Sequence, residues 1–211
     1  MDSMSKTDIL HTGRLYNPND SEIMQEQKER LRMLKDYNDT DPADFVLREN
    51  KLSEMFEYFG HGAYIEIPFR ANWAGKFVHF GDGCYANFNL TLVDDTHIFI
   101  GDHTMLGPCV TIATATHPLS PVLRQKGAQY NKPVHIGNNC FIGSGVTILP
   151  GVSIGDDTVI GAGSVVTKDI PSSVLAYGNP CRVIRSIDEN DERFYDGGKL
   201  IDSAWQENRL L

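Results

Sequence analysis

The sequence feature that most limits the fold is an apolar residue that recurs every six positions through the second half of the chain. The spacing is unbroken over Ile136, Ile142, Ile148, Ile154, Ile160 and Val166, and a glycine directly follows four of these six residues. The same interval occurs earlier, and there it includes one shift of two residues. The earlier members are Phe80, Ala86, Leu92 and Ile98, then Ile100, Leu106 and Ile112.

A period of six matches neither an amphipathic helix nor the alternation of a simple strand. It is typical of a chain that turns a corner every six residues, so that the apolar residue points inward and stacks on its counterpart in the next coil. A glycine beside that residue relieves crowding where the backbone bends. A long helix is the alternative, and the glycines and the proline of 143–163 disfavour it. The period therefore predicts an all-β solenoid.

The region before the repeat predicts helices. Residues 20–60 carry a charge-rich pattern with an apolar face, for which Asp20 or Ser21 supplies an N-cap and Gly60 an end. A second helix is expected to start at Asp41 with Pro42 in its first turn, after a turn at 37–40. The expected apolar face consists of Ile23, Leu31 and Leu34.

These patterns divide the chain into three parts. We expect a helical arm at 1–60, a solenoid at 61–187 with an external loop at 118–133, and an extension at 188–211. The arm is interpreted as a cap or a substrate lid. The extension carries aromatic and aliphatic residues, which indicate that it docks and is not free coil, but its sequence assigns it no role.

Composition excludes several classes of protein. The 19 Lys and Arg against 28 Asp and Glu give a net charge of −9, which disfavours a nucleic-acid partner bound through a basic field. Four cysteines without a CxxC pair favour a reducing compartment. There is no signal-peptide-like apolar run at the start and no stretch long enough to span a membrane. We expect a cytoplasmic protein with no membrane association.

Four segments carry a specific resemblance. They are YANFNLTLVDD at 85–95, ATATHPL at 113–119, IGNNCFIGSGVTILPGVSIGDDTVIGAGSVVTKDIP at 136–171 and GNPCRVIR at 178–185. They resemble the maltose and galactoside O-acetyltransferases, a family of hexapeptide-repeat acetyltransferases. The resemblance implies a left-handed parallel β-helix with three hexads in each triangular coil. It also implies acetyl-CoA as acetyl donor, and homotrimers with active sites between neighbouring subunits.

Histidines are the candidates for a catalytic base. His79, His97, His117 and His135 each precede an inward position, so all four are expected to point outward. Only His117 is followed by a long aperiodic stretch, 118–133, which can form a pocket wall. The resemblance implies that His117 is the general base on an acceptor hydroxyl, and that the backbone N–H of Ser144 stabilises the oxyanion. The alternative for His117 is a surface histidine before a surface loop.

The resemblance also implies residues for acceptor and cofactor binding. For the acceptor these are Asn72, Tyr85, Asn87 and Asp95, while three residues, Asn17, Asn19 and Asp20, compete for the family's N-terminal acidic position. For coenzyme A they are Phe141, Ser144, Ala162 and Thr167, and a basic cluster at the end of the solenoid supplies partners for its phosphates. That cluster consists of Lys168, Arg182 and Arg185. Each of these roles has a structural alternative. In these alternatives, residues 94–95 are solvated turn residues, residues 162 and 164 are ordinary corner residues, and Phe141 is an exposed apolar side chain on the face that packs in the trimer.

The predicted function is acetyl-CoA-dependent O-acetylation of a sugar or glycoside in a ternary complex. Cys84 and Cys140 occupy inward positions, which disfavours a thiol nucleophile. A xenobiotic or antibiotic acceptor is an alternative within this class. A zinc lyase of the γ-carbonic-anhydrase type shares the solenoid, but the HxxxxH spacing is missing and no metal is expected. A non-enzymatic scaffold protein is the remaining alternative, and it is disfavoured because it gives the loop 118–133 and the basic cluster no function.

Overall fold

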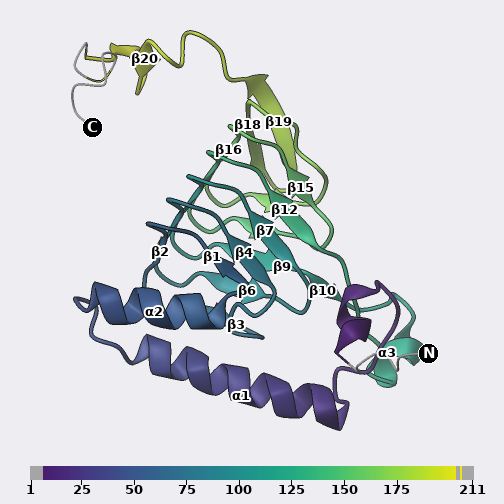
Figure 1. The fold of residues 1–211 in the computed structure, drawn as a ribbon. Coiled ribbons are helices and arrows are strands. Elements are labelled where there is room, and N and C mark those ends of the chain that lie inside the picture. Colours follow the sequence, from purple (N-terminus) through teal and green to yellow (C-terminus); the bar gives the residue numbers. More distant parts are fainter. Residues whose placement is uncertain (1–6, 203–204, 206–211) are drawn as a thin grey trace.

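The computed structural model describes residues 7–202 and 205, and three parallel sheets wound around one core form its body (Figure 1). Face 1 contains β1 (Tyr58–Phe59), β4 (Val78–Phe80), β7 (Ile98–Ile100), β12 (Val134–Ile136) and β15 (Ser153–Ile154). Face 2 contains β2 (Tyr64–Ile65), β5 (Tyr85–Ala86), β8 (Met105–Leu106), β13 (Phe141–Ile142), β16 (Val159–Ile160) and β18 (Val174–Gly178), with β19 (Cys181–Ser186) antiparallel at its edge. Face 3 contains β3 (Arg70–Ala71), β6 (Thr91–Val93), β9 (Thr111–Ala113), β14 (Thr147–Ile148) and β17 (Val165–Val166). The predicted parallel β-helix is confirmed.

The hexad residues form the core by stacking on one another. On face 1, Phe80, Ile100, Ile136 and Ile154 are paired in register from coil to coil, and each is at most 3% exposed. Burial of such a side chain contributes about 2 kcal/mol relative to an exposed one. The two-residue shift has a simple cause: β7 buries both Ile98 and Ile100, so the inward position is counted twice within one strand.

The glycines at the corners between faces 1 and 2 are required by the next coil. A Cβ on Gly137 would lie 2.4 Å from Oδ1 of Asp156. That oxygen accepts a hydrogen bond from the Asn138 N–H at 2.7 Å, and Oδ1 of Asn138 accepts one from the Asp102 N–H at 2.9 Å. Glycine therefore makes room for a ladder of Asp and Asn side chains that satisfies the corner amides.

Two helices lie across the base of the solenoid, beneath its first coil (Figure 1). The first, α1 (Ser21–Asn38), is capped by Asp20, which accepts a hydrogen bond from the Glu22 N–H at 3.0 Å. Of the two predicted N-caps, Asp20 and Ser21, the structure therefore selects Asp20. The expected turn at 37–40 begins too early, because Tyr37 is still helical and fully buried, and its hydroxyl donates to the Ile65 carbonyl at 2.6 Å. Leu31 was expected on the buried face but is 42% exposed.

The second helix, α2 (Phe45–Met55), starts later than predicted. Asp41 accepts from the Ala43 N–H in a local turn, and Asp44 is the N-cap, accepting from the Leu47 N–H at 3.0 Å. The helix ends at Met55, before the predicted Gly60, because the chain from Tyr58 pairs with β4 as the first strand of the solenoid. The solenoid therefore starts well before its hexads become regular.

The remaining elements lie at the two ends of the solenoid. Beside α1 the chain forms η1 (Asp8–His11), and the segment after β9 forms β10 (Ala115–Thr116), α3 (Pro121–Gln125) and β11 (Tyr130–Asn131), of which β10 and β11 pair antiparallel. At the far end, a hairpin of β20 (Phe194–Tyr195) and β21 (Lys199–Leu200) extends away from the last coils (Figure 1). Part of the predicted extension, 203–204 and 206–211, lies outside the described residues. Among the residues that are described, no helix is long and apolar enough to cross a membrane.

Candidate active site

Two edges of the solenoid differ in the length of their corners. Between faces 3 and 1 the corners are irregular, and we call this the long-corner edge; it comprises 72–77, 94–97, 114–133, 149–152 and 167–169. Between faces 2 and 3 the corners are uniform, and we call this the glycine edge; it comprises 87–90, 107–110, 143–146 and 161–164. The predicted site residues are divided between them.

His117 lies on the long-corner edge, directly after β10, and is exposed. Its Nδ1 lies 2.8 Å from the backbone carbonyl oxygen of Ala128, on the returning half of the same corner. A carbonyl only accepts, so Nδ1 carries the proton and Nε2 of the neutral ring keeps its lone pair. The arrangement therefore provides an oriented base that faces solvent.

Asn72 and Asp95 meet on the same edge although they come from different coils. The Asn72 amide donates to Oδ2 of Asp95 at 2.8 Å, and the Gln129 amide lies 3.2 Å from Oδ1. Asp95 is only 6% exposed, and burial raises its pKa. The interpretation of Asp94 and Asp95 as solvated turn residues is therefore wrong.

Asp94 holds the corner beneath this cluster. It is fully buried, and its two oxygens accept from the N–H groups of Trp73 and Gly75, each at 2.8 Å. Burial raises its pKa to about 6, against these two hydrogen bonds, which favour the carboxylate. Its two bonds fix the backbone that carries Asn72.

Sequence reasoning missed a buried polar network beside Asp95. The Asn131 amide donates to the backbone carbonyls of Leu10 and Asp95, both at 3.0 Å, and Gln129 donates to the hydroxyl of Tyr16. Burial, reinforced by Asp95, raises the pKa of Tyr16 to about 12, so the phenol stays neutral. Tyr16 and Asn131 are 115 positions apart. The absence of any period in 118–133 gave no signal for this contact.

The glycine edge presents backbone donors. Among the residues described, the N–H groups of Ser144 and Ala162 have no hydrogen-bond partner. The equivalent N–H of Phe88 is taken by the side chain of Asn87 at 2.7 Å, and Pro108 has none. A Cβ on Gly107 would lie 2.7 Å from the Ser144 nitrogen, and one on Gly143 would lie 2.6 Å from that of Ala162. These two glycines keep the two free amides uncovered.

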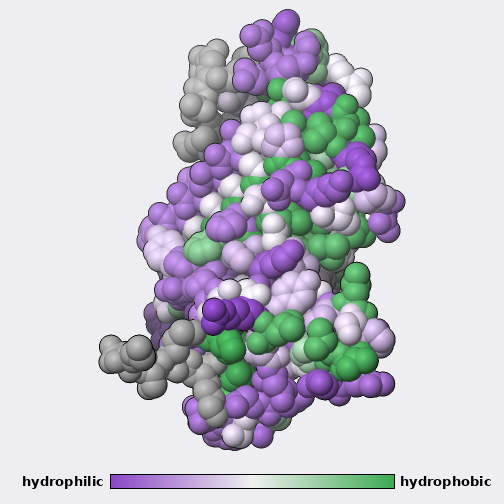
Figure 2. Space-filling model, turned by 90° about the vertical axis from the view of Figure 1, so that its right-hand side faces the viewer, coloured by the Kyte–Doolittle hydropathy of each residue, from purple (hydrophilic) through white to green (hydrophobic). Residues whose placement is uncertain are grey.

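Tyr85 and Phe141 lie on face 2, next to the glycine edge. With Met105 between them, they form an outward column in register, and Phe141 is 45% exposed. The Tyr85 hydroxyl lies 3.4 Å from a carboxylate oxygen of Glu66. Hydrophobic and hydrophilic side chains are interspersed on the side of the molecule seen in Figure 2, so exposed apolar groups are not confined to one patch.

The predicted cationic cluster is spread over the last coils. Thr167 and Lys168 follow β17 on the long-corner edge, whereas Arg182 and Arg185 are in β19. All four are exposed. Arg185 makes a bidentate ion pair with Asp191, both contacts at 2.6 Å, and this pair lowers the pKa of Asp191 to about 2. Arg182 donates to its neighbouring carbonyl, of Cys181, at 2.8 Å.

The structure thus unites some predicted residues and separates others. The long-corner edge carries His117, Asn72 and Asp95. The glycine edge and the adjoining face 2 carry the other group, Ser144, Ala162, Asn87, Tyr85 and Phe141. Since face 3 lies between the two edges, one chain does not bring His117 to the N–H of Ser144.

Comparison with known proteins identifies the class of this solenoid. Residues 133–168 match the family model described as bacterial transferase hexapeptide (six repeats), and residues 10–60 match the maltose acetyltransferase hexapeptide capping motif. The chain is 55% identical over 193 residues to a galactoside O-acetyltransferase of Lactococcus lactis, covering 92% of this chain and 93% of the relative.

Solved structures agree in fold over nearly the whole chain. A galactoside acetyltransferase in complex with coenzyme A superposes with a TM-score of 0.90 at 40% identity, covering 95% of this chain and 100% of that one. A hexapeptide-repeat acetyltransferase from Vibrio cholerae, complexed with acetyl coenzyme A, gives 0.81 at 32% identity, covering 88% and 100%. The fold and these matches define an acyltransferase enzyme of the hexapeptide-repeat class. Within that class, the chain belongs to the maltose and galactoside O-acetyltransferase family.

Proposed function

We propose that this enzyme transfers the acetyl group of acetyl-CoA to a hydroxyl of a sugar or glycoside, with His117 as general base. The observation that carries the proposal is the contact of His117 Nδ1 with the Ala128 carbonyl oxygen at 2.8 Å. This contact selects the tautomer whose Nε2 can accept a proton. It also fixes the ring on a corner that departs from the rigid solenoid.

The reaction proceeds in a ternary complex. Nε2 of His117 takes the proton of the acceptor hydroxyl while its oxygen attacks the thioester carbon. The tetrahedral oxyanion accepts a hydrogen bond from the free N–H of Ser144. Collapse breaks the carbon–sulfur bond, and the thiolate of coenzyme A takes the proton from the imidazolium. No acetyl-enzyme forms, and the buried thiols of Cys84 and Cys140 take no part.

The active site forms between copies of the chain, in a homotrimer. The long-corner edge of one copy, with His117, faces the glycine edge of the next, with Ser144. Support comes from the division of the predicted residues over two edges that face 3 separates. Closed cyclic assemblies join two different surfaces in this way at every interface. In each copy, the helices α1 and α2 of the arm cover the base of the solenoid.

Coenzyme A lies along the glycine edge of one copy. The free amides of Ser144 and Ala162 bind its polar groups, and Phe141 of the same copy lines the pantetheine arm, with Thr167 contributed by the long-corner edge of the neighbouring copy. Lys168, next to Thr167 on that neighbouring edge, and Arg182 bind phosphate, because both are exposed and neither is engaged by a carboxylate among the described residues. Arg185 contributes less, because Asp191 already occupies its guanidinium.

The acceptor binds at the long-corner edge of one copy, and the neighbouring copy supplies Tyr85 and Asn87. Asp95 and Asn72 form a polar cluster suited to hydroxyl groups, since both offer directional donors or acceptors. The test is an acceptor screen that follows release of free thiol from acetyl-CoA. Turnover with maltose or galactosides supports the proposal. Turnover with amino sugars or antibiotics only, or with none of these acceptors, contradicts it.

A further inference from the structure

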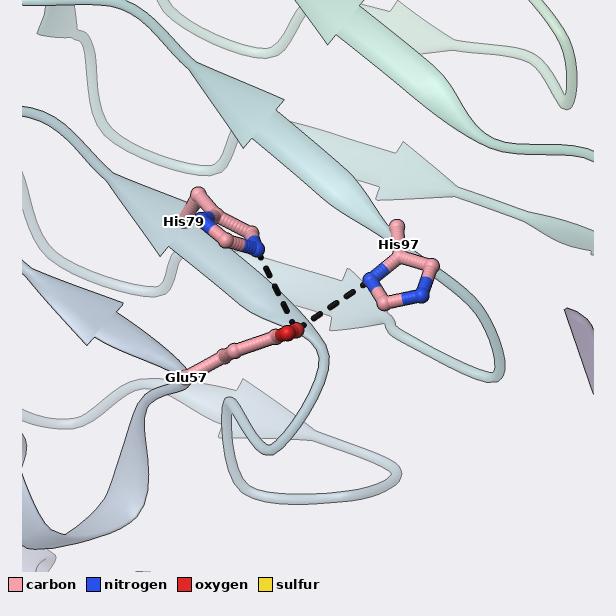
Figure 3. Close-up of side chains that lie close together, drawn as sticks. All are labelled: Glu57, His79 and His97. Carbon is pink, nitrogen blue, oxygen red and sulfur yellow. Dashed lines mark hydrogen bonds and ion pairs between the residues drawn. The ribbon is translucent and has the colours of Figure 1, made fainter. Parts of the chain in front are cut away.

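A second cluster of chemically active side chains lies on face 1, away from His117. Glu57, His79 and His97 direct their polar atoms toward one point (Figure 3). His79 Nε2 and His97 Nδ1 each lie 3.2 Å from the same oxygen, Oε2 of Glu57. The three potential ligand atoms lie within 4.8 Å of one another. Nothing in the proposed acetyl transfer uses these residues.

The scaffold of this cluster is rigid. Its members come from three successive coils: Glu57 immediately precedes β1, His79 is the middle residue of β4, and His97 immediately precedes β7. The His79 ring stacks on Phe99 with centroids 4.7 Å apart, and the His97 ring stacks on the same Phe99 at 5.6 Å. The ring positions are therefore set by packing before any ligand arrives.

We propose that Glu57, His79 and His97 bind one divalent transition-metal ion, of which Zn²⁺ is the representative. Metal–ligand distances of about 2.0–2.2 Å in a tetrahedron place neighbouring ligand atoms about 3.3–3.5 Å apart. Both contacts of Glu57 Oε2, at 3.2 Å, are close to that separation. A small rotation of the imidazoles brings the two nitrogens to the same spacing, and water completes the fourth position.

The proton count is consistent with metal binding. His97 Nδ1 and His79 Nε2 both donate to the Glu57 carboxylate without metal, so binding moves each proton to the other nitrogen of the same ring. Within the part of the chain that the structure describes, His97 Nε2 has no hydrogen-bond partner, so it can hold the proton and donate it to solvent. Lys76, on the neighbouring corner 72–77, is paired with Glu26.

The donor set selects the class of ion. Two imidazoles and one carboxylate suit Zn²⁺, Ni²⁺ and Cu²⁺, whereas Mg²⁺ and Ca²⁺ require mostly oxygen ligands. The side chains of Glu57, His79 and His97 are 39%, 35% and 30% exposed, so an ion can enter from solvent. A bound ion would join three coils next to the corner 94–97, which also carries Asp95. Its role is structural, and it stabilises the folded state by mass action.

The test is a titration of the full-length chain, free of any affinity tag and stripped with EDTA, with Zn²⁺ in competition with a chromogenic chelator. We expect one saturable Zn²⁺ per chain and a rise in the thermal midpoint. Glu57→Gln and His97→Gln should each weaken binding at least about tenfold. The matched control is His135→Gln, because His135 also stacks on Phe99 on face 1 but lies outside the cluster; its affinity should be unchanged.

Co²⁺ absorption gives a readout that mere stacking would not change. Wild type and His135→Gln should show the visible bands of a low-coordinate cobalt site, and Glu57→Gln should lose them. Circular dichroism of each variant confirms that it is folded. Equal Zn²⁺ affinity in all three variants, or no saturable binding to the folded wild type, overturns the proposal.

Discussion

The glycine edge and the long-corner edge arise from the same repeat but differ in what they can offer a substrate. On the glycine edge every corner has the same length, and its third residue has a positive φ, at Asn89, Cys109, Gly145 and Gly163. On the long-corner edge the corners differ, and they bury carboxylates and amides such as Asp94, Asp95 and Asn131. Uniform corners expose main-chain N–H donors, whereas irregular corners bury polar side chains and fix their positions.

The difference teaches where each kind of chemistry can be placed on a solenoid. An exposed N–H at a fixed position needs only a repeat with small residues, as Gly107 and Gly143 show beside Ser144 and Ala162. An oriented imidazole needs an inserted segment that returns to it, as the carbonyl of Ala128 returns to His117. The predictions that follow remove one of these contributions at a time.

Removing the side-chain contribution should have the largest effect. His117→Ala is expected to lower kcat by about 10²–10⁴, because it removes the proton acceptor. Affinity for acetyl-CoA, measured by calorimetry, should be nearly unchanged. The control is His61→Ala, another exposed histidine. Undiminished turnover of His117→Ala would contradict its role as base.

Removing the main-chain contribution should have the next largest effect. Ser144→Pro deletes the N–H and should lower kcat by about 10²–10³. The corner tolerates proline, since Pro108 occupies the equivalent position in the preceding coil. Ser144→Ala keeps the N–H and should retain activity close to that of wild type. Equal kinetics for the proline and alanine variants would show that the amide is not a donor in the reaction.

The long-corner edge should also make the free energy of unfolding depend on pH. Burial raises the pKa of Asp94 from an ordinary value of 3.8 to about 6 in the folded chain. Between these pH values the folded state binds more protons than the unfolded state. The free energy of unfolding should therefore fall by about 2 kcal/mol as pH rises from about 4 to about 6, and by about 3 kcal/mol over the whole titration, relative to Asp94→Asn.

Urea unfolding of wild type and Asp94→Asn at several pH values across that window measures the difference. Asp95 titrates in both proteins, so the comparison isolates Asp94. Parallel curves for the two proteins would exclude Asp94 as the source of the slope.

The smallest of these effects is expected from the cations beyond both edges. Arg182→Ala should raise the KM for acetyl-CoA about tenfold, the size expected for one charge-assisted hydrogen bond to phosphate. Arg185→Ala should have less effect, because Asp191 holds that guanidinium in a bidentate pair. Steady-state kinetics in both substrates distinguishes them. An effect of Arg182→Ala confined to the acceptor would contradict a role in cofactor binding.

The two edges were not equally predictable from the sequence. The six-residue period placed inward residues such as Ile142 and Ile160 correctly. An apolar residue that recurs every six positions occupies the equivalent inward position on each face of the coil. The predicted solenoid, 61–187, contains most of the first coil, but the hexads of that coil were not identified, since Ile65 and Ala71 are followed by Glu66 and Asn72 and not by glycine. The second helix was started at the wrong acidic residue, because Asp41 and Asp44 can both cap and only the fold selects Asp44.

The side chains of the long corners were predicted one by one, without their contacts. The resemblance supplied Asn72 and Asp95 as separate candidates. Their hydrogen bond of 2.8 Å was not predicted, because it joins residues of two adjacent coils. Gln129 and Asn131 were not found, because a buried amide in an aperiodic segment has no pattern that distinguishes it from a solvated one. The pairing of Arg185 with Asp191 was also missed, since Arg185 was predicted as a phosphate ligand while Asp191 was counted only in the total charge.

The central claim is that the two edges complete an active site only between copies of the chain. His117→Ala and Ser144→Pro, each expected to lower kcat at least about 100-fold alone, should be unfolded and refolded together at equal concentration. Random assembly then pairs an intact His117 edge with an intact Ser144 edge at about a quarter of the interfaces, because each condition is met half the time. We predict recovery of about that fraction of wild-type turnover. Mixed assemblies that form but stay inactive would contradict the claim.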